Sequence, residues 1–117
     1  IVEDDIEIVR LLEIHLKDLG CQVLSAIRGD IGLQKALKEN PDLIILDVML
    51  PGRSGYEILE DMRADEAMSN LPVLMLTARG QTRDREMAEK IGASRFMTKP
   101  FANSDVLEAV RELTSHV

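Results

Sequence analysis

Short apolar, strand-like runs alternate along the chain with segments in which apolar residues recur at helical spacing. The runs are Ile1–Val2, Gln22–Ile27, Leu43–Leu46, Val73–Leu76 and Arg95–Met97. Leu43–Leu46 contains no polar residue, and a continuous apolar run between turn signals is typical of a parallel strand covered on both faces. These runs predict five short strands with a buried centre.

In the segments between and after these runs, apolar residues recur at helical spacing. Helices are expected at Ile6–Leu19, Gly29–Glu39, about Tyr56–Arg63, Gln81–Ile91, and from Asn103 or Ser104 onward. A glycine follows the first and the fourth of these helices, as a left-handed residue often does at a helix end. The fourth helix has only Met87, Ala88 and Ile91 to bury, so we expect it to be loosely held.

The amino-terminal strand is shorter than the others. Only Ile1 and Val2 precede the first acidic residue, whereas a buried strand usually runs about 5 residues. We therefore expect the natural strand to begin upstream of Ile1. The 117 residues suit a single domain over 1–117, with no linker, repeat or output domain in this segment.

Composition indicates a soluble protein that does not bind nucleic acid directly. The chain is 45% hydrophobic and 30% charged, and its net charge of -7 repels a phosphate backbone because no basic stripe is present. The aromatic content of 3% also disfavours a stacking surface for single-stranded nucleic acid. The apolar stretches are too short to span a membrane, and the single cysteine suits a reducing compartment, so we expect a cytoplasmic location.

Polar residues stand where the strand-like runs break off. They are Glu3, Asp4, Asp47, Thr77 and Lys99. Because ligands of open α/β sheets bind outside the carboxyl ends of the strands, a parallel sheet would bring these side chains together. The acids would hold a divalent cation there, while the hydroxyl and the ammonium would bind the oxygens of a phosphoryl group.

Asp47 is the residue that favours a metal site over an ordinary helix start. Glu3 and Asp4 alone leave helix capping and metal binding open, since acids also suit helix amino termini. Asp47, however, lies between apolar neighbours, where a carboxylate beside other carboxylates is costly unless a cation neutralises it. Hard oxygen ligands suit Mg²⁺, with Mn²⁺ as the alternative.

Thr77, Phe96 and Lys99 are weaker signals when each is taken by itself. A hydroxyl after a strand is often a turn residue, and Phe96 is by its type a core residue. Lys99 precedes Pro100, and a Lys-Pro pair suits a fixed turn that aims the ammonium inward. The placement of Phe96 three residues before Lys99 is what raises a functional role for the aromatic ring.

Four segments together resemble the receiver domain of two-component response regulators. They are Val2–Asp5, Leu46–Gly55, Leu76–Arg79 and Phe96–Phe101. The resemblance covers essentially the whole chain, in order. It implies a three-layer, flavodoxin-like (βα)5 fold with a central five-stranded parallel sheet in the strand order 2-1-3-4-5.

The resemblance also implies a role for each polar residue at the sheet edge. Asp47 would accept the phosphoryl group, while Thr77 and Lys99 would bind its oxygens. Thr77 would also act with Phe96 as the switch that reports phosphorylation. The transfer itself needs positioning and positive charge more than it needs an acid or a base.

For the metal, the resemblance implies a shared set of oxygen ligands. They come from Glu3, Asp4, Asp47 and the backbone carbonyl of Met49. Asp4 would bind the cation directly and Glu3 through water. Asp5 would then be a helix cap.

The implied function is a signalling switch that catalyses only its own phosphorylation and dephosphorylation. A sensor histidine kinase or a phosphotransfer protein would supply the phosphoryl group. The surface formed by the fourth helix, the fifth strand and the fifth helix would then bind an effector or a second copy. One departure is Ser94-Arg95, which stands where regulators with a winged-helix DNA-binding domain often carry an acidic pair.

Two other functions fit the residues less well. An aspartyl-phosphate phosphatase would need a second acid two residues beyond its nucleophile, where this chain has Met49. A docking module that works without phosphorylation would not need usable chemistry at all five sheet-edge positions. The histidines, His15 and His116, are isolated in the sequence and are expected on solvated helix surfaces rather than as phosphodonors.

Overall fold

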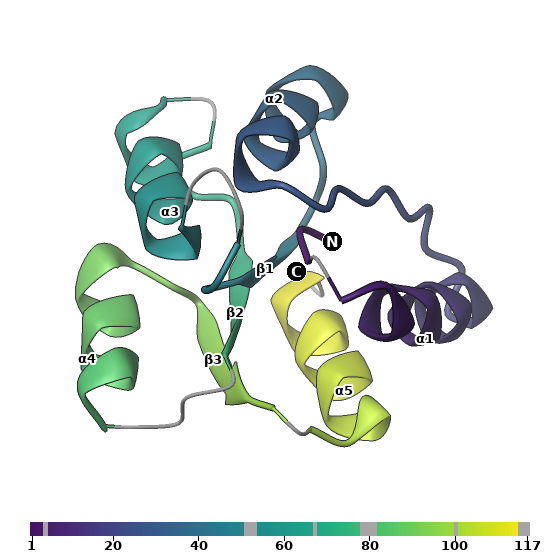
Figure 1. Ribbon diagram of the computed structural model, residues 1–117. Coiled ribbons are helices and arrows are strands. Elements are labelled where there is room, and N and C mark those ends of the chain that lie inside the picture. The colour runs from purple at the N-terminus through teal and green to yellow at the C-terminus, as the bar shows by residue number, and fades with distance from the viewer. Residues whose placement is uncertain (4, 51–53, 67, 78–81, 100, 115–117) are drawn as a thin grey trace.

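The computed structural model describes residues 1–3, 5–50, 54–66, 68–77, 82–99 and 101–114. Within these residues the helices are α1 (Ile6–Asp18), α2 (Gly29–Glu39), α3 (Gly55–Ala64), α4 (Thr82–Ile91) and α5 (Asn103–Thr114) (Figure 1). The strands are β1 (Ile44–Asp47), β2 (Val73–Thr77) and β3 (Arg95–Thr98). No helix in this described part is long and apolar enough to cross a membrane.

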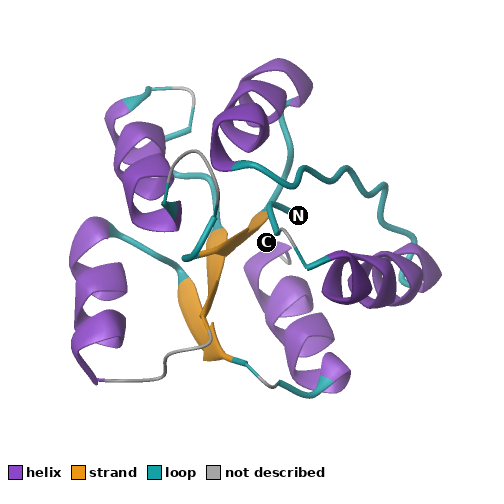
Figure 2. Cartoon of the chain, viewed as in Figure 1, coloured by secondary structure: helices purple, strands orange, loops and turns teal. Residues whose placement is uncertain are grey.

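The strands form a parallel sheet in the order β1-β2-β3 at the centre of the molecule (Figure 2). Isolated parallel bridges continue the sheet beyond β1. Val2 pairs with Leu46 of β1 on one side and with Ala26 on the other. The order from Ala26 across Val2 to β3 therefore follows the expected arrangement 2-1-3-4-5, and the chain has a flavodoxin-like α/β fold.

Two of the five predicted strands are present only as bridges among the described residues. Ile1–Val2 contributes Val2 and Gln22–Ile27 contributes Ala26, so the short strand predicted at 22–27 is present only as an isolated parallel bridge. The central strands each end one residue later than predicted and so include Asp47, Thr77 and Thr98.

Alternate residues of the buried strands pack into two separate cores. In β2, Val73 and Met75 join a core with residues of α2, α3 and α4, whereas Leu74 and Leu76 join a core with residues of α1 and α5. The helices therefore form two outer layers, with α2, α3 and α4 on one face of the sheet and α1 and α5 on the other (Figure 1). The prediction that the apolar runs are covered on both faces is confirmed.

The helix ends follow local sequence signals. Asp5 caps α1, since its Oδ1 accepts a hydrogen bond from the Glu7 amide at 3.0 Å, which confirms the cap predicted there. Gly20 and Gly92 have φ angles of 89° and 110°, so the predicted glycine stops are also confirmed. Asn40 ends α2 with a φ of 49°. The chain therefore turns back to the sheet after each of these helices at a residue suited to a left-handed conformation.

Candidate functional site

Asp47 lies at the carboxyl end of β1, in the middle of the sheet. Its amide donates to the Val2 carbonyl at 2.9 Å, and its register partner on β2 is Leu76. The residue is only 3% exposed, so its carboxylate is largely removed from water. A buried carboxylate in this position requires a cationic partner.

Glu3 brings a second buried carboxylate to the same place. Its amide donates to the Ala26 carbonyl at 3.0 Å, and the residue is 0% exposed. Its Oε2 accepts from the Asp5 amide at 3.3 Å, whereas its Oε1 has no hydrogen bond of regular geometry. Burial raises the pKa of Glu3, and the neighbouring Asp47 carboxylate adds to this rise while Lys99 opposes it.

Lys99 supplies the positive charge that these acids need. Its Nζ lies 2.5 Å from Glu3 Oε1 and 3.4 Å from Asp47 Oδ2, so the ammonium points inward between the carboxylates as the sequence predicted. Burial alone lowers the pKa of Lys99, but the Glu3 and Asp47 carboxylates outweigh burial and the pKa is raised. Lys99 therefore remains charged at neutral pH.

The end of β2 positions both Thr77 and Lys99. Thr77 is 1% exposed and lies opposite Thr98 of β3 in the sheet register. The Lys99 amide donates to the Thr77 carbonyl at 2.6 Å, which ties the two residues together directly after their strands. The structure thus brings Glu3, Asp47, Thr77 and Lys99 to one edge of the sheet, as the sequence predicted.

Gly55, at the start of α3, is a supporting residue that sequence reasoning treated only as part of a turn. Its amide donates to the Val48 carbonyl at 2.9 Å. A Cβ at this position would lie 2.2 Å from the Asp47 carbonyl oxygen and 2.9 Å from the Val48 Cα. Only glycine therefore allows α3 to begin directly against the backbone that carries Asp47. The close backbone approach has no signature in the sequence beyond the glycine itself.

The predicted switch aromatic, Phe96, lies on β3 and is half-buried. The guanidinium carbon of Arg85, on α4, is 5.8 Å from the centroid of the Phe96 ring. This distance is within the range of a cation–π interaction. The contact links α4 to the strand that leads to Lys99, a connection that the sequence pattern did not indicate.

The oxygen donors that meet at this edge of the sheet fit a hard cation. Asp4 lies outside the described residues, and among the described ones no group of three or more acidic, histidine or cysteine side chains gathers. The two buried carboxylates of Glu3 and Asp47 nevertheless converge beside a single ammonium, that of Lys99. Met49, whose carbonyl is the other predicted ligand, lies in the loop just after Asp47 with its side chain 59% exposed.

His15 is not the isolated, solvated residue that the sequence predicted. It is half-buried on α1, and its Nε2 lies 3.2 Å from the Asn103 side-chain nitrogen on α5. The contact joins residues 88 apart in the sequence, so no local pattern pointed to it. His116 lies outside the described residues.

Comparison with known proteins finds transcriptional regulators among the relatives of this chain. The chain is 40% identical over 113 residues to the alkaline phosphatase synthesis transcriptional regulatory protein PhoP of Bacillus subtilis (strain 168), covering 97% of this chain and 46% of that protein. It is 41% identical over 113 residues to the DNA-binding dual master transcriptional regulator RpaA of Synechocystis sp., covering 97% of this chain and 47% of that protein. The chain thus spans about half the length of these relatives.

Solved structures share the fold closely. The BeF3-activated N-terminal receiver domain of Klebsiella pneumoniae RstA has a TM-score of 0.88 and 28% identity, covering 98% of this chain and 96% of that chain. The receiver domain of a sensor histidine kinase from Pseudomonas aeruginosa PAO1, with magnesium coordinated in its active-site cleft, has a TM-score of 0.89 and 27% identity. That match covers 98% of this chain and 94% of the other.

A family model described as the response regulator receiver domain matches residues 1–111. This match covers the sheet, the carboxylates beside Lys99 and most of α5. The chain therefore belongs to the response regulator receiver domain family, whose members act in phosphorylation-dependent two-component signalling.

Proposed function

We propose that Asp47 is the residue of this receiver domain that accepts the phosphoryl group. The observation that carries the proposal is the convergence of Asp47, Glu3 and Lys99 at one sheet edge, with Lys99 Nζ 2.5 Å and 3.4 Å from the two carboxylates. Asp47 is the acid at the end of the central strand. Receiver domains interact with histidine kinases, and we infer that such a kinase or a phosphotransfer protein is the donor here.

In the proposed transfer, one carboxylate oxygen of Asp47 attacks the phosphorus of a phosphohistidine on the donor. The phosphorus–nitrogen bond breaks, its electron pair stays on the imidazole nitrogen, and Asp47 becomes an acyl phosphate. Charge is spread over three phosphoryl oxygens in such a transfer, so positioning and nearby positive charge supply most of the catalysis. Water later attacks the acyl phosphate, which releases inorganic phosphate and restores the Asp47 carboxylate.

Lys99 and Thr77 are the residues proposed to hold the phosphoryl oxygens. The Lys99 ammonium already lies 3.4 Å from Asp47 Oδ2, so a phosphoryl group on that oxygen would come within reach of it. The Lys99 amide donates a hydrogen bond to the Thr77 carbonyl at 2.6 Å, so the hydroxyl and the ammonium would approach the phosphoryl group together. We propose that this receiver domain catalyses only its own phosphorylation and dephosphorylation.

A divalent cation, Mg²⁺ or Mn²⁺, completes the proposed site. Glu3 and Asp47 would hold it together with Asp4 and the Met49 carbonyl. When bound, it would neutralise charge on the phosphoryl oxygens and on the clustered carboxylates. The chain's own part is to exclude water from the acids and to keep Lys99 charged beside them.

The output surface is proposed to include α4, β3 and α5. In the sheet register Thr77 lies beside Thr98 of β3, the strand that also carries Phe96, and this adjacency supports the proposed transmission from the phosphorylated edge to this surface. We propose that phosphorylation draws the Thr77 side chain inward and lets Phe96 change its rotamer, which alters binding to an effector or to a second copy. Direct DNA binding by residues 1–117 is not part of the proposal, because their net charge is -7.

Neither rival function is favoured by a specific contact. A phosphatase would need an acid in place of Met49, whose side chain is 59% exposed. A docking module without phosphorylation would have no use for buried, mutually paired charges, which are costly to remove from water. A docking module would also leave the inward direction of Lys99 without a role.

Intact-mass measurement after incubation with acetyl phosphate and Mg²⁺ tests the assignment. We expect one added phosphoryl group on the wild type and on Asp42→Asn, whose exposed carboxyl lies just before β1. Asp47→Asn should stay unmodified, and EDTA should suppress the labelling of the wild type. Equal labelling of Asp47→Asn and wild type would overturn the assignment of Asp47.

A further inference from the structure

Helix α2 has a buried face made of small residues. Its buried residues are Gly29, Gly32 and Ala36, so none of them carries a side chain larger than a methyl group. A glycine inside a helix is less favourable than an alanine, because it loses more backbone freedom on folding. Gly32, one turn into the helix, therefore needs an explanation in the packing around it.

Val2 is the residue that Gly32 faces. A Cβ placed on Gly32 would lie 2.6 Å and 2.7 Å from the two methyl carbons of Val2 and 3.3 Å from the Val2 Cβ. Contacts below 3.0 Å essentially do not occur for real Cβ atoms, so even alanine would force a displacement. Val2 is 5% exposed and shares its core with Ala36, one turn further along α2. The backbone of α2 therefore lies directly against the Val2 side chain.

The backbone of Val2 is joined to both acids of the proposed phosphorylation site. Its carbonyl accepts from the Asp47 amide at 2.9 Å, and its amide donates to the Ile45 carbonyl at 2.8 Å. Glu3 follows Val2 in the chain, and its amide donates to the Ala26 carbonyl at 3.0 Å. A displacement of Val2 would therefore move Glu3 through the chain and Asp47 through a hydrogen bond.

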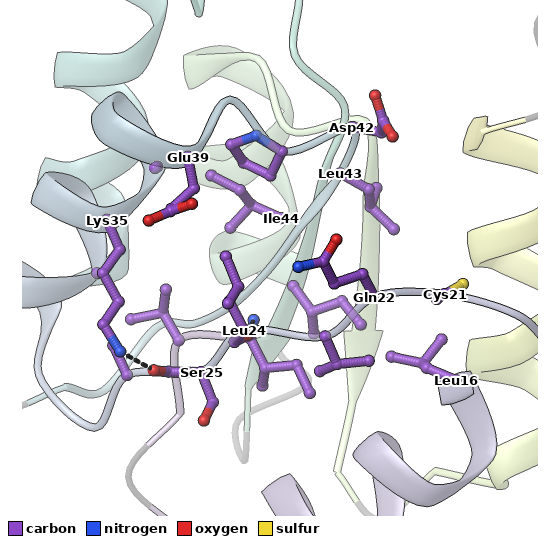
Figure 3. A pocket seen from close by; sticks show the side chains of 18 of the residues that line it. Leu16, Cys21, Gln22, Leu24, Ser25, Lys35, Glu39, Asp42, Leu43 and Ile44 are labelled. Atoms are coloured by element: carbon purple, nitrogen blue, oxygen red, sulfur yellow. Dashed lines mark hydrogen bonds between the residues drawn. The ribbon is translucent and has the colours of Figure 1, made fainter. Parts of the chain in front are cut away.

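Helix α2 is also tied to the segment on the other side of Val2. Lys35 Nζ, on α2, donates to the Ser25 carbonyl at 2.6 Å, as Figure 3 shows. Ser25 directly precedes Ala26, the residue that forms a parallel bridge with Val2. Because this hydrogen bond holds the helix close to Val2, added volume at position 32 would push on Val2 and not only move the helix away.

We propose that Gly32 is a positioning residue for phosphoryl transfer. The absence of a side chain at this position sets where Val2 lies, and through Val2 it sets where Glu3 and Asp47 lie. Gly55 supports Asp47 from α3, whereas Gly32 supports both acids from α2. The inference rests on the proposed function for the reaction that it serves, in which small displacements of the reacting groups are costly.

Gly32→Ala and Ala36→Gly form a matched pair for the first test. Each variant changes one methyl group on the buried face of α2, but only Gly32→Ala adds volume against Val2. We expect Gly32→Ala to slow labelling by acetyl phosphate about tenfold, and Ala36→Gly to stay within about twofold of the wild type. Equal labelling rates for the two variants would overturn the proposal.

Val2→Ala tests whether the effect passes through Val2. This change removes both methyl carbons that the new Cβ would meet, so adding it to Gly32→Ala should restore the labelling rate to within about twofold of Val2→Ala alone. A double variant as slow as Gly32→Ala would overturn the proposal. If Gly32→Ala does not fold by itself, the double variant must still fold and label at the rate of Val2→Ala, and failure to do so would equally overturn it.

Backbone amide NMR shifts, measured without a phosphodonor, separate this inference from the assignment of Asp47. In Gly32→Ala we expect the largest shift changes outside α2 at Val2, Glu3 and Asp47, and their reversal in the double variant. These shifts report the position of the backbone whether or not Asp47 accepts the phosphoryl group. Unchanged amides of Glu3 and Asp47 would overturn the role of Gly32, whereas equal labelling of Asp47→Asn and wild type would overturn only the proposed function.

Discussion

Helices α3 and α4 pack on the same face of the sheet but are held in different ways. In α3, Gly55, Ile58, Leu59 and Met62 are buried, and the helix starts against the backbone of Asp47. In the described side chains of α4, residues 85–91, only Ala88 is buried. The first helix is thus a fixed support for the site, whereas the second is held by few apolar side chains among those that the structure describes.

Arg63 joins these two helices at one end. Its Nε donates to the Gly92 carbonyl at 3.0 Å, and its Nη1 donates to the carbonyls of Met68 and Leu71 at 3.1 Å and 2.8 Å. Burial lowers the pKa of this guanidinium. The carboxyl end of α4 is therefore anchored to α3, while the Arg85–Phe96 contact reaches β3 from the body of the helix. A pivoting motion of α4 about its anchored end fits this distribution of contacts.

Leu59→Ala should have the largest effect of the changes that test this contrast. Leu59 is 0% exposed in the core below α3, so truncation leaves a cavity and should cost about 2–5 kcal/mol of unfolding free energy. Met87→Ala on α4 is the matched control, since Met87 is 46% exposed, and should cost less than about 0.5 kcal/mol. Urea denaturation of both variants measures the difference, and similar losses would remove the contrast between the helices.

Gly55→Ala should damage the site as well as the fold. The added Cβ would clash with the Asp47 carbonyl, so α3 must shift at a cost of about 1–3 kcal/mol. We expect the rate of labelling by acetyl phosphate to fall by about tenfold, because small displacements of a reacting group are costly.

Ser54→Ala is the control for Gly55→Ala. It removes the α3 cap, in which Ser54 Oγ accepts from the Glu57 amide at 3.2 Å, and should cost about 1 kcal/mol. The labelling rate should stay near that of the wild type. A labelling rate that falls equally in both variants would mean that loss of α3 stability, not the position of Asp47, sets the rate.

Arg63→Met should loosen the anchored end of α4 at a smaller cost. Loss of the guanidinium leaves carbonyls without a donor, and we expect about 1–2 kcal/mol of destabilisation. Faster hydrogen exchange at the carboxyl end of α4 than at the start of α3 is the expected signature. Uniformly faster exchange across both helices would contradict a local anchor.

Arg85→Ala should have the smallest effect of these changes. It should alter the movement of Phe96 rather than the free energy of unfolding. An exposed cation–π contact contributes about 0.5–1 kcal/mol, so its loss should ease the movement of Phe96 and tighten beryllofluoride binding about two- to fivefold. Arg95→Ala is the control, because it removes a nearby charge that pairs with Glu112 and not with Phe96. NMR titration measures both, and unchanged or weaker binding by Arg85→Ala would contradict a restraining role.

The prediction for α4 shows what the helical spacing of apolar residues can predict and what it cannot. The sequence indicated a helix with few apolar residues, and the structure agrees on the helix, from Thr82 to Ile91. Of the three apolar residues predicted to be buried, Ala88 is buried and Ile91 packs against the core as a partly buried residue, whereas Met87 is 46% exposed, so the prediction for Met87 is wrong. With so few apolar positions, the spacing alone does not define which side of a helix is buried.

The amino-acid sequence by itself determined the α/β architecture and the central strands. It also determined that Glu3, Asp47, Thr77 and Lys99 lie close together, because parallel strands bring their carboxyl ends to one edge of the sheet. Tertiary structure decided the contacts between distant elements. The Gly55 backbone approach and the His15–Asn103 contact depend on how the helices and strands pack against one another. Such contacts depend on shape complementarity and hydrogen bonding between residues that are far apart in the sequence. A local sequence pattern cannot predict them.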